Sequence, residues 1–198
     1  MIGVVEAFSD SYALARQKFL QGCLKAGLAV DSRPLPLLGA QGEPLAMDAA
    51  FDGPADAQRL LVVSSACHGV EGHCGSGVQV FALHDAEWRT KARDAGVAVL
   101  YIHALNPHGF SHGRRVTQEN ADLNRNFVDI SQPLPVNAPH AQLHPPPLPA
   151  HWPPPPPDAA ALNAWVAKHG LSAVLAALSA GQYKSADRPF TRGTGPSL

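Results

Sequence analysis

A histidine and a glutamate stand three positions apart, shortly after an apolar run of the chain. The run covers residues 60–63, and His68-Gly69-Val70-Glu71-Gly72 follows it after four small residues. A short, continuous, β-branched run between turn residues is typical of a buried strand, and open α/β sheets bind ligands beyond the carboxyl ends of their strands. Imidazole and carboxylate are zinc ligands, and the glycines allow a sharp backbone path that turns both toward one ion. His68 and Glu71 are therefore candidates for half of a zinc site; a surface His and Glu in a turn are the alternative.

The segments that follow this turn predict a β-α-β unit. Residues 72–93 predict a helix with a glycine-rich start, and residues 96–102 form a second apolar run that predicts a buried strand. The glycines do not form a phosphate loop, because neither a Gly-Lys-Ser/Thr sequence nor a dinucleotide fingerprint follows them. A right-handed crossover makes the two strands parallel, so the loop at residues 103–110 should emerge beside His68 and Glu71.

The segments before the turn predict packing elements. Residues 9–25 show helical periodicity with a serine available as the N-cap. Residues 28–38 contain two prolines and therefore predict an edge strand or a loop. Residues 39–58 contain scattered glycines and aspartates and predict connecting turns.

A proline-rich segment interrupts the second half of the chain. Residues 133–157 hold twelve of the nineteen prolines, so no packed helix or sheet is expected in them. We expect polyproline II or an irregular surface loop instead. Helices are predicted after it at residues 159–169 and 171–179.

Size and composition limit the class of protein. The 198 residues are enough for one sizeable core, and a net charge of −1 argues against nucleic-acid partners. Three cysteines are too few for a disulfide scaffold and favour a reducing compartment. Cys67 and Cys74 do not have the spacing of a zinc knuckle, so a packing role is the better interpretation of them. The sequence shows neither an export signal nor an apolar run of transmembrane length, so a cytoplasmic protein without membrane partners is expected.

Arginine and asparagine side chains add a second chemistry. Arg125 offers a planar charged fork that suits a carboxylate, and Asn124 adds an amide donor beside it. Arg114 and Arg115 supply further positive charge nearby in the sequence. Combined with a zinc half-site, these residues suggest cleavage of a bond beside a free carboxylate, with an arginine holding the developing oxyanion.

Three ordered motifs resemble a known family. His68-Gly69-Val70-Glu71-Gly72, Asn106-Pro107-His108-Gly109-Phe110 and Asp122-Leu123-Asn124-Arg125-Asn126-Phe127 are similar to motifs of the zinc metallocarboxypeptidase (carboxypeptidase A-like) superfamily. The likeness is greatest to a branch of largely uncharacterised bacterial proteins and covers residues 8–185. It implies a three-layer α/β fold, in which a mixed, mostly parallel sheet is flanked by helices.

The resemblance also implies roles for individual residues. His68 and Glu71 match the first two zinc ligands, and Arg115, or less readily Arg114, matches the oxyanion-stabilising arginine. Asn124 and Arg125 match the pair that binds the terminal carboxylate of the substrate. The alternative for that pair is a solvated turn with a helix-capping asparagine.

The departures from the family pattern concern the end of the chain. The third zinc ligand, a histidine, and the catalytic glutamate of the family would both follow Leu198, so residues 1–198 are expected to be a single incomplete domain with a Pro-rich insertion at about 133–157. We assign none of the other histidines as the third ligand; His103 comes nearest by position. A truncated sheet would leave a bare edge that invites self-association, and two ligands alone would hold zinc weakly.

The leading interpretation is a zinc-dependent carboxypeptidase-like hydrolase of a peptide or amide with a free carboxylate, inactive or incomplete as this chain. A metal-dependent deacylase of a non-peptide amide is the second enzyme hypothesis. A non-catalytic protein whose residues 145–157 bind SH3-like or WW-like grooves is the third. A thiol hydrolase that uses Cys67 and His68 is discounted, because adjacent side chains of an extended segment point to opposite faces.

Overall fold

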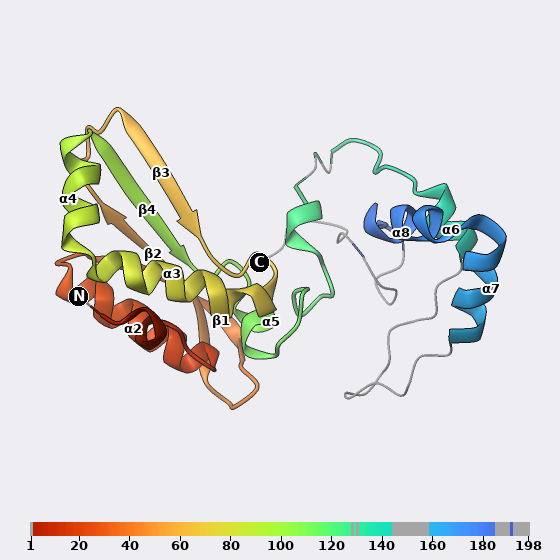
Figure 1. Cartoon of the computed structure of the whole chain (residues 1–198), viewed down its shortest axis with the longest axis horizontal. Helices are drawn as coiled ribbons and strands as arrows, with labels where there is room; N and C mark the ends of the chain where they lie inside the picture. The colour runs from red at the N-terminus through yellow and green to blue at the C-terminus, as the bar shows by residue number, and fades with distance from the viewer. Residues whose placement is uncertain (1, 128, 130, 144–158, 185–190, 192–198) are drawn as a thin grey trace. The chain divides into compact units, whose positions relative to one another are not determined.

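The computed structural model describes residues 2–127, 129, 131–143, 159–184 and 191 (Figure 1). These residues belong to two compact units, unit 1 (Met1–Thr117) and unit 2 (Gln118–Leu198). The Pro-rich insertion falls in unit 2, and residues 144–158 lie outside the described residues together with the polyproline run that they contain. The prediction of a single domain over residues 1–198 stays a prediction.

Unit 1 is an α/β structure built on a four-stranded sheet in the order β1-β2-β4-β3. The strands are β1 (Val30–Leu38), β2 (Pro44–Asp52), β3 (Arg59–Ser64) and β4 (Val97–His103). The expected parallel pairing of β3 with β4 is confirmed, whereas β1 with β2 and β2 with β4 are antiparallel. The α/β class is therefore confirmed, but a mostly parallel sheet is wrong for the four described strands.

Helices cover one face of this sheet (Figure 1). They are α2 (Tyr12–Lys25), α3 (Gly72–His84) and α4 (Ala86–Asp94), with short α1 (Val4–Ala7) at the N-terminus and α5 (Pro107–Ser111) after β4. The core between helices and sheet contains Phe19, Val80 and Tyr101, all fully buried. The described part of unit 1 thus contains two of the three expected layers.

The helix at residues 9–25 is confirmed with a later start, because Ser11 caps it and its Oγ accepts a hydrogen bond from the Leu14 N–H. The edge strand at residues 28–38 is also confirmed as β1, whose register shifts between Leu35 and Leu38. Prolines are compatible with such an edge position, because an edge strand leaves some of its N–H groups unpaired.

The turns predicted at residues 39–58 are wrong, because β2 occupies the middle of the sheet there. Two aspartates obscured its pattern. Asp48 and Asp52 face the helices and are buried, but each carboxylate meets arginine: Asp48 lies 2.6 Å from Arg16, and Asp52 lies 2.5 Å from Arg89. Paired in this way, a charge can be buried in a strand.

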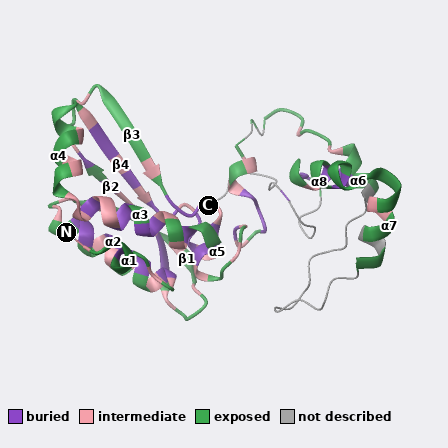
Figure 2. Cartoon of the chain, in the orientation of Figure 1, coloured by how far each residue is buried: buried purple, intermediate pink, exposed green. Residues whose placement is uncertain are grey.

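The strand at residues 60–63 exists as β3, but it is not buried in the described structure. β3 is the outer strand of the sheet, and Figure 2 shows most of it coloured as exposed. The side chains of Leu60, Leu61 and Val62 are 44–56% exposed. Phe51 of β2 is 43% exposed as well, and it shares one sheet face with Val62, since both are register partners of Leu100.

Unit 2 is helical in its described residues. It contains the 3₁₀ turn η2 (Leu123–Arg125), α6 (Ala138–Leu143), α7 (Ala159–His169) and α8 (Leu171–Ser179), so both helices predicted after the Pro-rich segment are confirmed. The expectation of no helix in residues 133–157 is wrong for α6. Its only proline, Pro139, lies in the first turn, where the missing N–H is not needed.

None of the helices in the described part of the chain combines the length and the apolar character that crossing a bilayer requires.

Removal of Arg89 is predicted to destabilise unit 1, because the buried carboxylate of Asp52 is then left with Arg93 alone. Burial by itself would raise the pKa of Asp52, but hydrogen bonds from Arg89 and Arg93 outweigh burial and hold that pKa below its ordinary value. Arg89→Met should lower the free energy of unfolding by about 3 kcal/mol at pH 7, because a buried carboxylate then loses a partner. The stabilisation from a depressed pKa is present above the unfolded-state value and is lost as pH falls through the folded-state value. Urea unfolding of the variant and the unchanged chain at pH 7 measures the loss of unfolding free energy. The same comparison below pH 4 shows whether the loss becomes smaller in acid.

The matched control is Arg33→Met, since Arg33 pairs with Asp31 on the surface, where both side chains are more than 60% exposed. This substitution should change little at either pH. An equal loss in both variants would contradict the prediction.

The exposed edge of β3 is predicted to pair with a second copy of the chain. In an antiparallel arrangement about Leu61 and Val62, Arg59 meets Ser64 of the other copy, so no like charges oppose each other, and the net charge of −1 adds little repulsion. Sedimentation velocity should show concentration-dependent association that Val62→Lys reduces, while Val4→Lys, at an exposed site in α1, leaves it unchanged. A monomer at all concentrations would refute the prediction.

Candidate functional site

The turn that carries the two candidate ligands lies directly beyond β3, as expected. Residues Gly69–Glu71 form the 3₁₀ turn η1, and α3 starts at Gly72. His68 Nδ1 and Glu71 Oε1 lie 2.9 Å apart. The His68 side chain is 12% exposed and the Glu71 side chain 62%, so the first candidate ligand is mostly buried and the second is mostly exposed to solvent.

The backbone leading into this turn is fixed by the loop that follows β4. Ser65 N–H donates to Ile102 O, Leu105 N–H to Ser65 O and Asn106 N–H to Ala66 O, each at 3.0 Å. This pairing confirms that the loops after the two parallel strands emerge together. Ala66 has a φ of +55°, and a non-glycine residue in this region costs about 1–3 kcal/mol, which the surrounding bonds must offset.

The glycines of the turn serve close packing. A side chain at Gly69 would overlap the backbone of Gly109 and Phe110, and one at Gly72 would overlap the ring of Phe110. Neither glycine has a positive φ. The expected role in a sharp backbone path is therefore wrong, and the real constraint is the approach of α5 to the turn.

Arg114 and Arg115 lie against the same turn. Val70 N–H donates to Arg114 O at 3.1 Å and Gly69 N–H to Arg115 O at 3.3 Å. The side chain of Arg115 is exposed and that of Arg114 is half-buried. The structure thus brings His68, Glu71 and the backbone of both arginines into one part of unit 1. Each arginine accepts one backbone hydrogen bond from the turn, so these contacts do not favour one arginine over the other.

Asn124 and Arg125 belong to unit 2, in η2. Arg125 Nη1 donates to Asp122 Oδ2 at 2.8 Å, and Arg125 Nε donates to the carbonyl of Ser179 at 2.9 Å. Asp122 is 1% exposed, so this arginine neutralises a buried carboxylate. Asn124 is exposed in the middle of η2 and caps neither end.

His103 has a packing role. Its ring is fully buried and stacks on Phe19 at a centroid distance of 4.8 Å, and its Nε2 lies 2.9 Å from Ser76 Oγ. Burial lowers the pKa of His103 to about 4. Within the described residues, no three His, Cys, Asp or Glu side chains are grouped so that they could hold a metal ion.

A second histidine with an altered pKa lies on α5. The pKa of His108 falls to about 4, because the ring is desolvated and because His112 and Arg114 are close enough to disfavour a further positive charge. The rings of His108 and His112 stack at 4.1 Å. The side of the turn that carries Arg114 therefore gains no charge from His108 near neutral pH.

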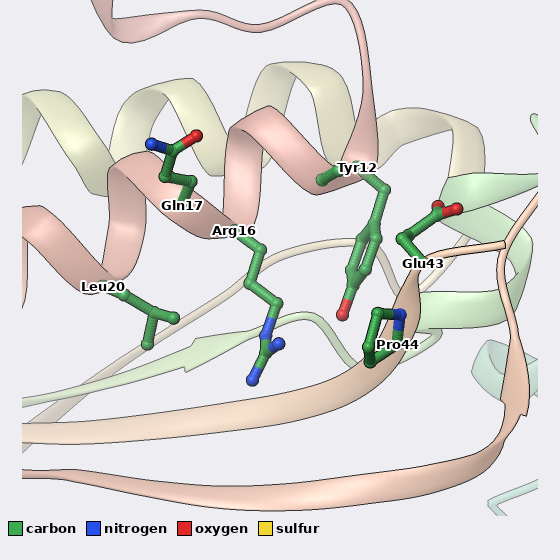
Figure 3. Close-up of a pocket in the computed structure, with 7 residues that line it drawn as sticks. Tyr12, Arg16, Gln17, Leu20, Glu43 and Pro44 are labelled. Carbon is green, nitrogen blue, oxygen red and sulfur yellow. The ribbon is translucent and has the colours of Figure 1, made fainter. Parts of the chain in front are cut away.

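A pocket of about 240 Å³ lies elsewhere, between α2 and the start of β2 (Figure 3). Two of its polar side chains are engaged in the fold: Tyr12 Oη donates to Ala46 O and accepts from Ala46 N–H, and Arg16 donates to Asp48. Burial raises the pKa of Tyr12 to about 12. We assign no chemistry to this pocket.

His68 and Glu71 fit half of a zinc site by their chemistry and by their closeness to each other. Two tetrahedral ligands at about 2.0–2.2 Å from zinc lie about 3.3–3.5 Å from each other. The observed 2.9 Å between His68 Nδ1 and Glu71 Oε1 needs a widening of about 0.5 Å to match. The remaining ligands would have to come from other groups or from water.

Comparison with known proteins gives a family but no activity. The family described as "Protein of unknown function (DUF2817)" matches residues 8–197. No curated protein matches the chain. Among solved structures, the glutaminyl cyclase of Porphyromonas gingivalis is similar, with 20% identity over 52% of this chain and 48% of that chain and a TM-score of 0.31.

The chain thus spans about half the length of that cyclase, and so low a TM-score supports no functional argument. The family match, in contrast, extends over nearly the whole sequence. The chain belongs to the DUF2817 family.

Proposed function

We propose that this chain carries part of a zinc-dependent amide hydrolase of the carboxypeptidase-like type, which cleaves next to a free carboxylate. The observation that supports the proposal is the pairing of His68 with Glu71 at 2.9 Å, beyond a parallel strand, on a turn whose backbone is bonded to Arg114 and Arg115. Two side chains that can ligate a metal, with arginines next to them along the backbone, supply the groups that amide hydrolysis at a metal uses.

Each residue has a distinct part in this proposal. His68 and Glu71 would hold the zinc ion, which when bound supplies Lewis acidity toward a carbonyl oxygen and a water molecule. Arg115 stabilises the negative charge that develops on the carbonyl oxygen, because its guanidinium stays protonated at any working pH. Arg114 is the alternative for this role.

Asn124 and Arg125 are proposed to bind the free carboxylate of the substrate. Arg125 would do so with the N–H groups that its bonds to Asp122 and Ser179 do not use. A planar fork anchored in this way loses little entropy when a carboxylate binds, which favours its use for recognition.

The substrate class is a peptide or another amide with a free carboxylate, and acylated amines without a peptide bond are the second class to test. We propose a cytoplasmic location, because three cysteines are too few for a disulfide scaffold and favour a reducing compartment.

Zinc binding is predicted to depend on both residues of the turn. The purified 198-residue chain should bind zinc, and His68→Ala and Glu71→Ala should each abolish that binding, as measured by metal analysis after gel filtration and by calorimetric titration.

The matched controls are His169→Ala and Glu87→Ala, which remove an exposed histidine and an exposed glutamate that lie outside the turn. They should bind zinc like the unchanged chain. Equal binding by His68→Ala and the unchanged chain would refute the metal assignment.

Arg115 is predicted to act on the rate and not on the metal. In any active enzyme that contains this chain, Arg115→Ala should lower kcat about 10²–10³-fold, because one oxyanion donor is lost. Zinc affinity should stay unchanged. The same measurement on Arg114→Ala separates the two arginines, and a larger loss in that variant would transfer the role to Arg114.

A further inference from the structure

Helix α3 is attached to the sheet by buried polar side chains at the place where β3 and β4 end. Gln79 is fully buried, and its Nε2 donates to Val63 O at 2.7 Å and to Ile102 O at 3.0 Å. One amide group therefore ties the helix to the two parallel strands at once, next to the point where their loops begin.

A second polar contact lies one turn earlier on the helix. Ser76 Oγ and His103 Nε2 lie 2.9 Å apart, and both residues are at most 2% exposed. His103 is itself held by stacking on Phe19 of α2. Ser76 and Gln79 are three residues apart, so they lie on one face of α3, and together they fix the rotation of the helix against the sheet.

The glycines of α3 bring its first turn close to the neighbouring elements. A side chain at Gly75 would come within 2.9 Å of Ser65 Cβ, and one at Gly72 would overlap Phe110. Glycines allow this approach but do not select one rotation of the helix. The hydrogen bonds of Ser76 and Gln79 select one rotation, because a hydrogen bond forms only within a narrow range of distances and angles.

The choice of glutamine is informative because it is not the residue that packing alone would favour. Gln79 Oε1 is buried and accepts no hydrogen bond from the described part of the chain. A buried unsatisfied acceptor destabilises a fold, so an apolar residue of this size would avoid a penalty that glutamine carries. Such departures from local consistency are expected where a residue serves a functional site.

The beginning of α3 decides where Glu71 lies, because Glu71 is the N-cap of this helix. We propose that Gln79, assisted by the Ser76–His103 hydrogen bond, is a positioning residue that sets where α3 begins and thereby holds Glu71 beside His68. This inference rests on the proposed function, since it concerns the geometry of the same metal-binding turn.

The test is metal binding by the full chain and three variants, with Zn²⁺ titrations and the visible absorption spectrum of bound Co²⁺ as readouts. Gln79→Met keeps the size of the side chain but removes both N–H donors. It should lower Zn²⁺ affinity about tenfold and change the Co²⁺ spectrum, the size of effect known for groups that orient metal ligands. Ser76→Ala should act in the same direction.

The matched control is Val80→Ala, at the next position of α3, which is fully buried in the apolar core and makes none of these bonds. It loosens the helix without touching the polar contacts, so affinity and spectrum should stay as in the unchanged chain. All titrations are made well below the thermal unfolding temperature of each variant. If Gln79→Met does not fold, Ser76→Ala decides the test.

The outcomes separate this inference from the proposed function. Absence of His68-dependent metal binding in the unchanged chain would overturn the proposed function and this inference with it. Binding that is equally tight in the unchanged chain and Gln79→Met would overturn this inference alone. An equal loss in Gln79→Met and Val80→Ala would also overturn it, because general loosening of the helix would then suffice.

Discussion

The meeting of the carboxyl ends of β3 and β4 is the constraint on which the rest of unit 1 depends. The parallel ladder reaches Ser64 and Ile102, and the hydrogen bonds of Ser65, Leu105 and Asn106 continue the pairing into both loops. Because these loop groups pair with each other, the chain has a fixed direction when it reaches Ala66. The left-handed backbone at Ala66 then turns it toward His68, and the paired loops stabilise this strained residue.

Polar contacts at a few points fix the helical layer on the sheet. Arg16 of α2 meets Asp48, and Arg89 of α4 meets Asp52, both within β2. Gln79 of α3 meets the backbone of β3 and β4. Buried ion pairs of this kind add little net stability over apolar packing, but they accept few alternative arrangements, and specificity is the better explanation for them here. The three long helices of this face, α2, α3 and α4, each have at least one such contact, which opposes sliding or rotation against the sheet.

The sequence was informative where chemistry and periodicity agreed. The turn at His68 and Glu71, the parallel pairing of its strand and the capped helix α2 follow from local patterns, and the structure has them. The central strand β2 was missed because Asp48 and Asp52 look like turn residues until their arginine partners, 32 to 41 positions away, are known. Gln79 was missed for the same reason. A glutamine inside an apolar helix was a visible signal, but its two acceptors come from strands that only the fold brings together.

The two candidate ligands differ in a way that matters for metal binding. His68 is nearly enclosed, whereas Glu71 is mostly exposed and close enough to bond to it. A metal ion would replace this hydrogen bond between the two side chains, and since one hydrogen bond contributes little net stability, the fold does not oppose the exchange. Preorganised donors reduce the rearrangement that binding requires. They still fill only two of the four positions of a tetrahedral zinc ion, so the affinity of the turn is governed by whatever supplies the other two.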